Sequence, residues 1–310
     1  MKKLLIIVFF LSGALLYAQE DIKKVANPMD RSAGDSIKAW TILGTAALNF
    51  TQAAFSNWAA GGQNSIGLGA LANFKADYKK KKHSWKNNLD LAYGFQFLGT
   101  GKEAAFTKTD DKIEYTTSYG YAVSKHWDVT LLVNFRTQFA NGYNYPNDSV
   151  EISKFLSPGY LVAGIGMNYV PAEYFQLYLS PAAGRFTFVS NPTLANAGAF
   201  GIDTSKFKHM KGEFGPYIRA VFNKEIFKNI TLNTSLELFS DYLKDFGNID
   251  VNWNVLMGFK VNKWFSATLN TQLLYDDDVM IKSTPLSQTI GPRTQFKEVI
   301  GIGISYTFNH

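Results

Sequence analysis

The stretch "VIGIGISYTF", Val299 to Phe308, decides the fold class of this chain. Large apolar side chains alternate in it with small or polar ones, and its apolar face carries Ile300, Ile302, Ile304, Tyr306 and Phe308. A period of two residues is typical of a β-strand, because successive side chains of a strand point to opposite faces. The last segment of the chain therefore predicts a strand with one apolar face.

The same alternation recurs in about eleven earlier segments, starting near Ala39. No charged residue falls on their apolar faces, whereas the opposite faces carry Lys75, Asp77, Asp90, Glu114, Arg136, Gln138, Arg219, Glu237, Lys260, Asn270 and Gln272. Many segments exceed the usual strand length of about 5 or 6 residues, and they match the about 9–11 residues of a tilted membrane-spanning strand. The pattern predicts an all-β protein, a transmembrane antiparallel β-barrel of about twelve strands.

The connections between these segments alternate in length, which gives a separate indication of topology. Short connections lie around Lys79 to His83, Ser124 to His126, Val170 to Tyr174, Asn223 to Lys228, and Asn262 to Lys263. Long ones cover Thr51 to Asn64, Gly99 to Asp110, Asn141 to Lys154, Asn191 to Met210, Tyr242 to Asn248, and Asp276 to Arg293. Twelve strands with both ends of the chain on one side need this arrangement. Outer-membrane barrels have short periplasmic turns and longer extracellular loops, so both termini are predicted to be periplasmic.

One segment changes phase, since Leu177 and Leu179 are odd-numbered whereas Phe186 and Phe188 are even-numbered. Pro181 lies between the two pairs, and Pro within a strand marks an edge or a bulge. We expect a β-bulge there.

The first residues have the pattern of a secretory signal peptide, with two lysines, an apolar run and a small residue at Ala18. We therefore expect a signal peptide over 1–18, a flexible periplasmic lead-in over 19–38 and one barrel domain over 39–310. The predicted location is the outer membrane of a Gram-negative bacterium. The chain has no Cys, which excludes disulfides and thiol chemistry.

Four motifs carry a family resemblance: "FLSPGYLVAGIGMNYVPAEYFQLYLSPAAGRFTFV" at Phe155 to Val189, "NWAAGGQN", "MKGEFGPYIRA" and "GPRTQFKEVIGIGISYTF". With these motifs the chain resembles an uncharacterised family of outer-membrane proteins from Bacteroidetes, over most of the mature chain. The resemblance implies an outer-membrane β-barrel. It implies no activity and no functional residues.

Seven charged residues of the polar faces are candidates for the barrel lumen: Lys75, Asp90, Glu114, Arg136, Arg219, Glu237 and Lys260. A buried polar group must be paired or hydrated, so this set fits a water-filled pore and a salt-bridged, plugged interior equally. Two functions follow. One is a passive channel for small polar solutes, and the other is a non-transporting scaffold or accessory subunit of an outer-membrane complex.

A third hypothesis, an outer-membrane lipase, needs a His base next to a nucleophilic Ser. The four His are His83 and His126 in predicted short turns, His209 at the end of a long loop, and His310 at the C-terminus. This placement argues against catalysis, and we predict that the protein is not an enzyme. The acids Asp276 to Asp278 lack the spaced Gly and Glu of a calcium loop, so no metal and no cofactor is predicted.

The expected partners are outer-membrane lipid and, for the scaffold hypothesis, outer-membrane proteins. A formal net charge of +6 that is spread along the chain does not indicate nucleic-acid binding. The basic turn Lys79, Lys80, Lys81 and Lys82 fits attraction to anionic headgroups and a plain solvated turn equally.

The first long connection, "FSNWAAGGQNS", is predicted to be a structural loop. Gly61 and Gly62 adopt positive φ at low cost where the chain reverses. Trp58 is predicted to fold back over the barrel mouth or into the lumen as a lid or anchor, with its indole N–H hydrogen-bonded. A sugar-stacking Trp is the alternative, but it rests on this single aromatic residue.

Overall fold

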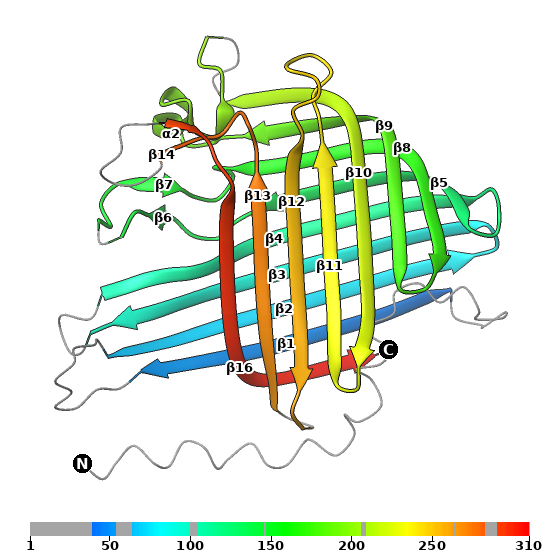
Figure 1. Ribbon diagram of the computed structural model, residues 1–310, viewed down its shortest axis with the longest axis horizontal. Coiled ribbons are helices and arrows are strands. Elements are labelled where there is room, and N and C mark those ends of the chain that lie inside the picture. Colours follow the sequence, from blue (N-terminus) through cyan, green and yellow to red (C-terminus); the bar gives the residue numbers. More distant parts are fainter. Residues whose placement is uncertain are drawn as a thin grey trace.

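The computed structural model describes residues 39–53, 64–99, 105–145, 147–205, 209–262, 265–282 and 290–309. Within them, twelve antiparallel strands close into one barrel in the order β1-β16-β13-β12-β11-β10-β9-β8-β5-β4-β3-β2 (Figure 1). They are β1 (Trp40–Ala53), β2 (Ser65–Lys80), β3 (His83–Leu98), β4 (Ala105–Ala122), β5 (Trp127–Thr137), β8 (Gly159–Ala172), β9 (Phe175–Phe188), β10 (Met210–Phe227), β11 (Ile230–Phe239), β12 (Asp250–Lys260), β13 (Phe265–Tyr275) and β16 (Gln295–Asn309). The predicted antiparallel barrel of about twelve strands is confirmed.

The remaining elements belong to long connections. They are the ribbon β6 (Gly142–Tyr143) with β7 (Glu151–Ser153), the helix α2 (Pro192–Asn196), the 3-10 turn η2 (Ala199–Gly201), and the ribbon β14 (Met280–Lys282) with β15 (Ile290–Pro292). Among the described residues, no helix is long and apolar enough to cross a membrane.

Closure joins the first strand to the last. β1 pairs with β16 from Leu43 opposite Asn309 to Phe50 opposite Ile302. A closed sheet has no edge with unpaired backbone groups. Consecutive barrel strands are neighbours throughout, so this is an up-and-down barrel.

Both barrel ends match the predicted alternation of connections. The β2–β3 turn is tight, since Lys80 pairs with His83 and Lys81 has a φ of 53°. Such turns gather at one end, called here the short-turn end, where β1 begins and β16 finishes; the long connections gather at the other, the loop end (Figure 1).

Some strands extend into the predicted connections: β4 begins at Ala105, within the connection expected to reach Asp110, and β10 continues to Phe227, within the one expected from Asn223. Phe106 extends the strand by packing on Phe95 and Phe97, with ring centroids 5.7 and 5.6 Å apart. The polar run after Phe106 hid this pairing. The predicted bulge in β9 is confirmed, since Ile165 pairs with Ala182 but Met167 pairs with Leu179.

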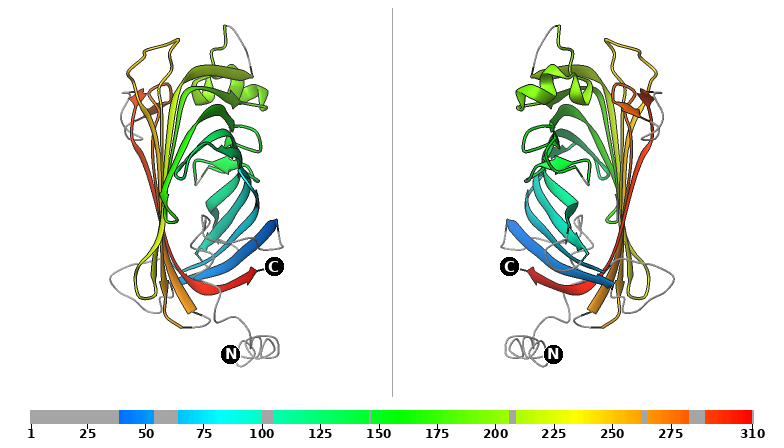
Figure 2. Two further views of the ribbon diagram at one scale, coloured as in Figure 1. Left: turned by 90° about the vertical axis from the view of Figure 1, so that its right-hand side faces the viewer. Right: turned by 90° about the vertical axis from the view of Figure 1, so that its left-hand side faces the viewer.

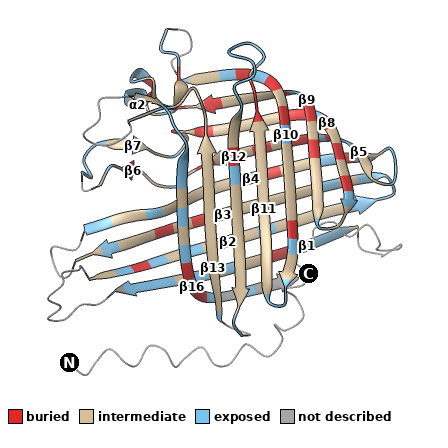
Figure 3. Cartoon of the chain, viewed as in Figure 1, coloured by how far each residue is buried: buried red, intermediate tan, exposed pale blue. Residues whose placement is uncertain are grey.

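The barrel is flattened, and its two walls cross. Figure 1 shows β1 to β4 running across the view behind the steeper β11, β12 and β13, and Figure 2 shows the two walls edge-on. Buried residues concentrate on β5, β8, β9 and β10 (Figure 3). The interior of the barrel is therefore filled more densely beside β5, β8, β9 and β10 than beside the other strands.

Neighbouring residues of β5 show which face points outward. Leu131 is 47% exposed, whereas Leu132 is 1% exposed and packs on other interior side chains. Large exposed apolar side chains of the predicted apolar faces occur on ten of the twelve barrel strands. The barrel thus carries its apolar side chains on the outside.

Candidate functional site: the barrel lumen

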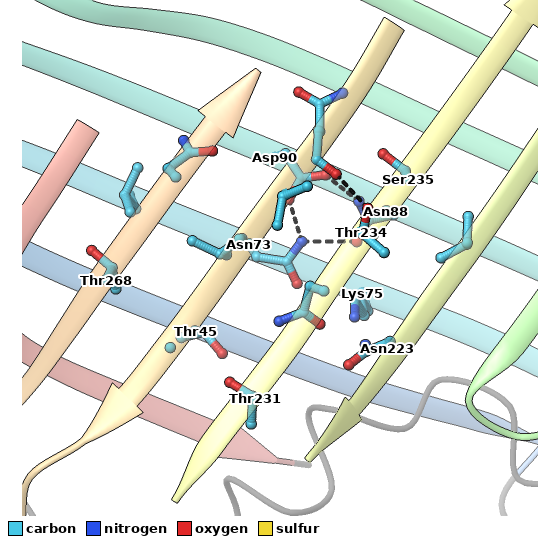
Figure 4. Close-up of a pocket in the computed structure, with 18 of the residues that line it drawn as sticks. Thr45, Asn73, Lys75, Asn88, Asp90, Asn223, Thr231, Thr234, Ser235 and Thr268 are labelled. Atoms are coloured by element: carbon cyan, nitrogen blue, oxygen red, sulfur yellow. Dashed lines mark hydrogen bonds between the residues drawn. The ribbon is translucent and has the colours of Figure 1, made fainter. Parts of the chain in front are cut away.

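A cavity of about 1270 Å³ occupies the lumen between β1 to β4 and β10 to β16. Its lining runs from Lys224 and Asn229 at the short-turn end to Asp110 and Lys297, a few residues from the loop end. Eleven Asn or Gln and eight Ser or Thr side chains line it, more than the charged residues. Figure 4 shows such side chains projecting into the cavity from both walls. The described lining is therefore mainly uncharged and polar.

Three neighbouring residues of β2 and β3 form a hydrogen-bonded group on the cavity wall (Figure 4). Asn73 Nδ2 donates to Asn88 Oδ1 at 2.8 Å and also to Asp90 Oδ1. Asn88 Nδ2 donates to the other carboxylate oxygen, Asp90 Oδ2. Both oxygens of Asp90 thus accept hydrogen bonds from amides.

Of the seven predicted lumen residues, Lys75, Asp90, Arg219 and Lys260 line the cavity. Glu237 lies beside Arg219, whose Nε donates to Glu237 Oε1 at 3.0 Å. This pair joins adjacent strands β10 and β11.

Glu114 and Arg136 face each other across β4 and β5. Glu114 Oε1 accepts a hydrogen bond from Asn134 Nδ2 at 3.0 Å. The Arg136 guanidinium lies over the Tyr160 ring, 5.1 Å from its centroid. These two residues are held by neighbours on the same wall.

An apolar cluster inside the barrel was missed by sequence reasoning. Leu132, Tyr178, Ala183, Tyr217 and Phe239 are buried together, and Tyr178 OH donates to Gly164 O at 2.6 Å. We call this group the packed corner. Each member lies on a face that is otherwise polar or small, so alternation gave no signal for it.

An ionic cluster lies near the loop end and was also missed. It consists of Arg185, Lys211, Glu213, Asp250, Asp276 and Asp278. Arg185 Nε donates to Glu213 Oε2 at 2.8 Å, and its guanidinium lies 4.3 Å from the Phe239 ring centroid. Arg185 on β9 also pairs with Asp250 on β12, although two strands separate them in the sheet. The cluster therefore joins strands that are not neighbours in the sheet.

Two loop acids of the ionic cluster differ in their pKa. Burial raises the pKa of Asp276 above its ordinary value, against the opposing charge of Arg185. Burial also acts to raise the pKa of Asp278, but hydrogen bonds from Lys211 and Lys244 outweigh it and hold this pKa below its ordinary value. Asp278 is thus the acid that is stabilised as an anion.

A salt bridge crosses the lumen in the part of the cavity nearest the loop end. Lys297 Nζ on β16 donates to Asp110 Oδ1 on β4 at 2.9 Å. These strands are not neighbours in the sheet, because β1, β2 and β3 separate them. The pair narrows the passage below the loops.

The described histidines lie away from the cavity wall. The Nδ1 atom of His83 lies 2.6 Å from Tyr119 OH. The Nδ1 atom of His126 lies 3.2 Å from Val170 O, and that of His209 lies 2.9 Å from Val189 O. Among the described residues, no group of three or more His, Asp or Glu is arranged to hold a metal ion. The loop anchor Trp58, Gly61 and Gly62 lies outside the described residues, as do 1–38.

The family model described as "Protein of unknown function (DUF3078)" matches residues 50–143. This match agrees with the resemblance to an uncharacterised family, whereas the bacterial group stays a prediction. No curated protein matches the chain.

Several solved structures are similar to this chain at low identity. An outer-membrane channel from Pseudomonas putida F1 has 12% identity, with 90% of this chain and 99% of that chain covered, at a TM-score of 0.38. The NanC porin has 8% identity, with 84% and 98% covered, at a TM-score of 0.35. The translocator domain of the autotransporter NalP from Neisseria meningitidis has 9% identity, with 92% and 93% covered, at a TM-score of 0.32. With such TM-scores, these matches do not bear on the activity of the chain.

Proposed function

We propose that the protein is an outer-membrane β-barrel that lets small polar solutes pass through its lumen. The outer surface supports the membrane location. Water-soluble monomers rarely expose apolar patches larger than a few hundred Å², yet this barrel exposes large apolar residues such as Leu48, Ile165 and Ile302 on most of its strands. Lipid is the solvent that such a surface fits, and a closed sheet satisfies the backbone within it.

The cavity is the observation that carries the channel function. Eight-stranded barrels have just enough interior for side chains, whereas barrels of 16–18 strands leave an aqueous channel. This twelve-stranded barrel lies between the two, and it keeps about 1270 Å³ of space with a mainly polar lining. Such a lining hydrates well and offers hydrogen bonds to polar solutes.

The alternative function, a non-transporting scaffold or accessory subunit, has its own support. The packed corner and the ionic cluster fill part of the lumen, and the Lys297–Asp110 pair crosses it. A barrel that uses its interior for stability and its loops for partners would have these features.

Planar-bilayer recording of the purified protein separates the two functions. We expect steady open-channel steps. Asn270→Trp, which places a large ring in the cavity, should lower the step size, whereas Leu48→Trp on the outer surface should not. Silence across many insertions would support the scaffold instead.

The orientation is part of the proposal, with the short-turn end in the periplasm. A protease added to intact cells should cut, if anywhere, within Asn191 to Met210 or Asp276 to Arg293. Cleavage at the exposed turn Lys79 to Lys82 in intact cells would reverse the orientation.

A further inference from the structure

The charges that line the cavity are unequal in number. Among the described residues, seven Lys or Arg side chains but only four Asp or Glu side chains line it. A lumen lined by an excess of one sign raises the local concentration of ions of the opposite sign. This count alone favours anions.

The acids of the lining are already engaged. Both oxygens of Asp90 accept amide hydrogens from Asn73 and Asn88. Glu225 Oε1 accepts a hydrogen bond from the backbone N–H of Asn229 at 2.9 Å. These carboxylates have fewer acceptor positions left for a passing cation.

The other two acids have cations beside them. Asp110 is paired with Lys297 at 2.9 Å. Asp77 lies directly opposite Lys86 in the register of β2 and β3, and Lys86 is the strongest opposing charge that acts on it. Three of the four acids of the lining, Asp90, Glu225 and Asp110, therefore have direct partners. Asp77 has a cation opposite it on the neighbouring strand.

Two cations of the lining differ from this pattern. No hydrogen bond or salt bridge joins the ammonium group of Lys75 or Lys260 to any residue that the structure describes. The charges of Asp90 and Asp77 act on Lys75 without direct contact. Each ammonium group thus keeps three N–H donors for a species in the cavity.

A neutral donor lies close to Lys75. The Thr45 hydroxyl is buried, lines the cavity and has no partner among the described residues. Thr45 on β1 pairs with Asn73 on β2, two residues from Lys75 on the same face. Such diagonal neighbours have Cα atoms about 7–8 Å apart, a separation that one small anion bridges.

We infer that the lumen selects small anions, and that Lys75 with Thr45 binds the carboxylate or phosphate group of a solute in transit. Lys260, at the short-turn end of β12, adds a second cationic position along the same cavity. This inference rests on the proposed channel function and names its class of solute.

The first test is the reversal potential in a planar bilayer under a KCl gradient. We expect chloride to be preferred over potassium, and Lys75→Met to lower the permeability ratio at least about twofold. Lys75→Arg keeps the charge and should keep the preference. Lys80→Met is the matched control, because it removes the same charge from the exposed end of the same strand, outside the cavity.

The second test measures binding of inorganic phosphate to the purified protein by calorimetry. Lys75→Met should abolish it and Thr45→Val should weaken it, whereas Lys80→Met should not change it. If Lys75→Met does not fold, two other single variants replace it. Lys75→Arg should still bind phosphate, and Lys260→Met should show a reduced preference for chloride over potassium in the bilayer.

The outcomes distinguish the two proposals. Open channels without anion preference, or with a preference that Lys75→Met and Lys260→Met leave unchanged, would overturn the anion inference and leave the channel function standing. Silent bilayers together with phosphate binding that depends on Lys75 would overturn the channel function but support the anion site. Silent bilayers without phosphate binding would overturn both.

Discussion

The packed corner and the cavity are two regions of one sheet that use their inward faces differently. At the packed corner, aromatic and aliphatic side chains of β5, β9, β10 and β11 pack together inside the barrel, and Tyr178 and Tyr217 on the adjacent strands β9 and β10 have ring centroids 6.2 Å apart. In the cavity, short amides and hydroxyls leave the space between the walls open. The interior is filled beside β5 and β8 to β11 and open between β1 to β4 and β11 to β16, so strand number alone does not determine how much of this barrel is open.

The same contrast applies to the interior cations. Arg185 is held between Glu213, Asp250 and the Phe239 ring. Lys260 lines the cavity with no described partner. Removing a cation of the ionic cluster should therefore lower the stability of the barrel, whereas removing a cation of the cavity should change which solutes pass.

Removing one cation from each region gives the largest expected difference. Arg185→Met leaves Glu213 and Asp250 buried without their main partner, which should lower the free energy of unfolding by about 3–5 kcal/mol. Lys260→Met should lower it by less than about 0.5 kcal/mol, because it breaks no pair. Urea unfolding in lipid vesicles measures both. Equal losses of unfolding free energy in the two variants would contradict the distinction between the ionic cluster and the cavity.

The outer face should respond according to depth in the membrane. Ile302, at the middle of β16, is 56% exposed on the outside. Ile302→Arg should cost about 2–4 kcal/mol, whereas Phe296→Arg near the loop end should cost about 0–1 kcal/mol. The same unfolding measurement applies. If Ile302→Arg unfolds like wild type, that face of β16 does not contact lipid.

Two glycines of the barrel, Gly166 on β8 and Gly69 on β2, give a smaller contrast. A Cβ on Gly166, beside the β9 bulge, would lie 2.2 Å from the backbone oxygen of Leu179, whereas one on Gly69 would meet only Asn49 Cβ at 3.8 Å. Gly166→Ala should therefore cost about 1–3 kcal/mol through overpacking. Gly69→Ala should be neutral or slightly stabilising, since Ala loses less backbone entropy. Indistinguishable melting temperatures for the two variants would mean that the bulge yields.

Much of the fold could be predicted because alternation is a local signal. It assigned Leu131 and Ile302 to the outer face and located the bulge at Pro181, and the lengths of the connections gave the order of strands. Where a polar strand end lacked apolar alternation, as after Phe106, the boundary was wrong.

The content of the lumen could be predicted only in part. Alternation placed Lys75 and Arg219 on the inward face, and both line the cavity. It could not find pairs such as Arg185 with Asp250, because these strands are not neighbours in the sheet and their contact depends on the three-dimensional shape of the barrel. Arg185 was further hidden by the change of phase at the bulge.

The smallest expected effect is the pH dependence of stability that comes from Asp278 in the ionic cluster. The folded-state pKa of Asp278 is held below its ordinary value by Lys211 and Lys244, although burial opposes this. A depressed folded pKa stabilises the protein above the unfolded pKa of about 3.9, and this contribution is lost as pH falls through the folded value. Asp278→Asn should therefore lose less than about 1 kcal/mol at neutral pH.

The difference in unfolding free energy between wild type and Asp278→Asn should stay constant from about pH 8 to about pH 5 and shrink below about pH 4. The comparison with the variant is needed because the pKa of Asp276 is shifted in the opposite direction. Burial raises the folded-state pKa of Asp276, so protonation of this residue on acidification favours the folded state. Lys244→Met is the matched partner variant, since Lys244 bonds to Asp278 from the exposed side of the loop. A wild-type advantage that grew on acidification would show that Asp278 is not the anion of this cluster.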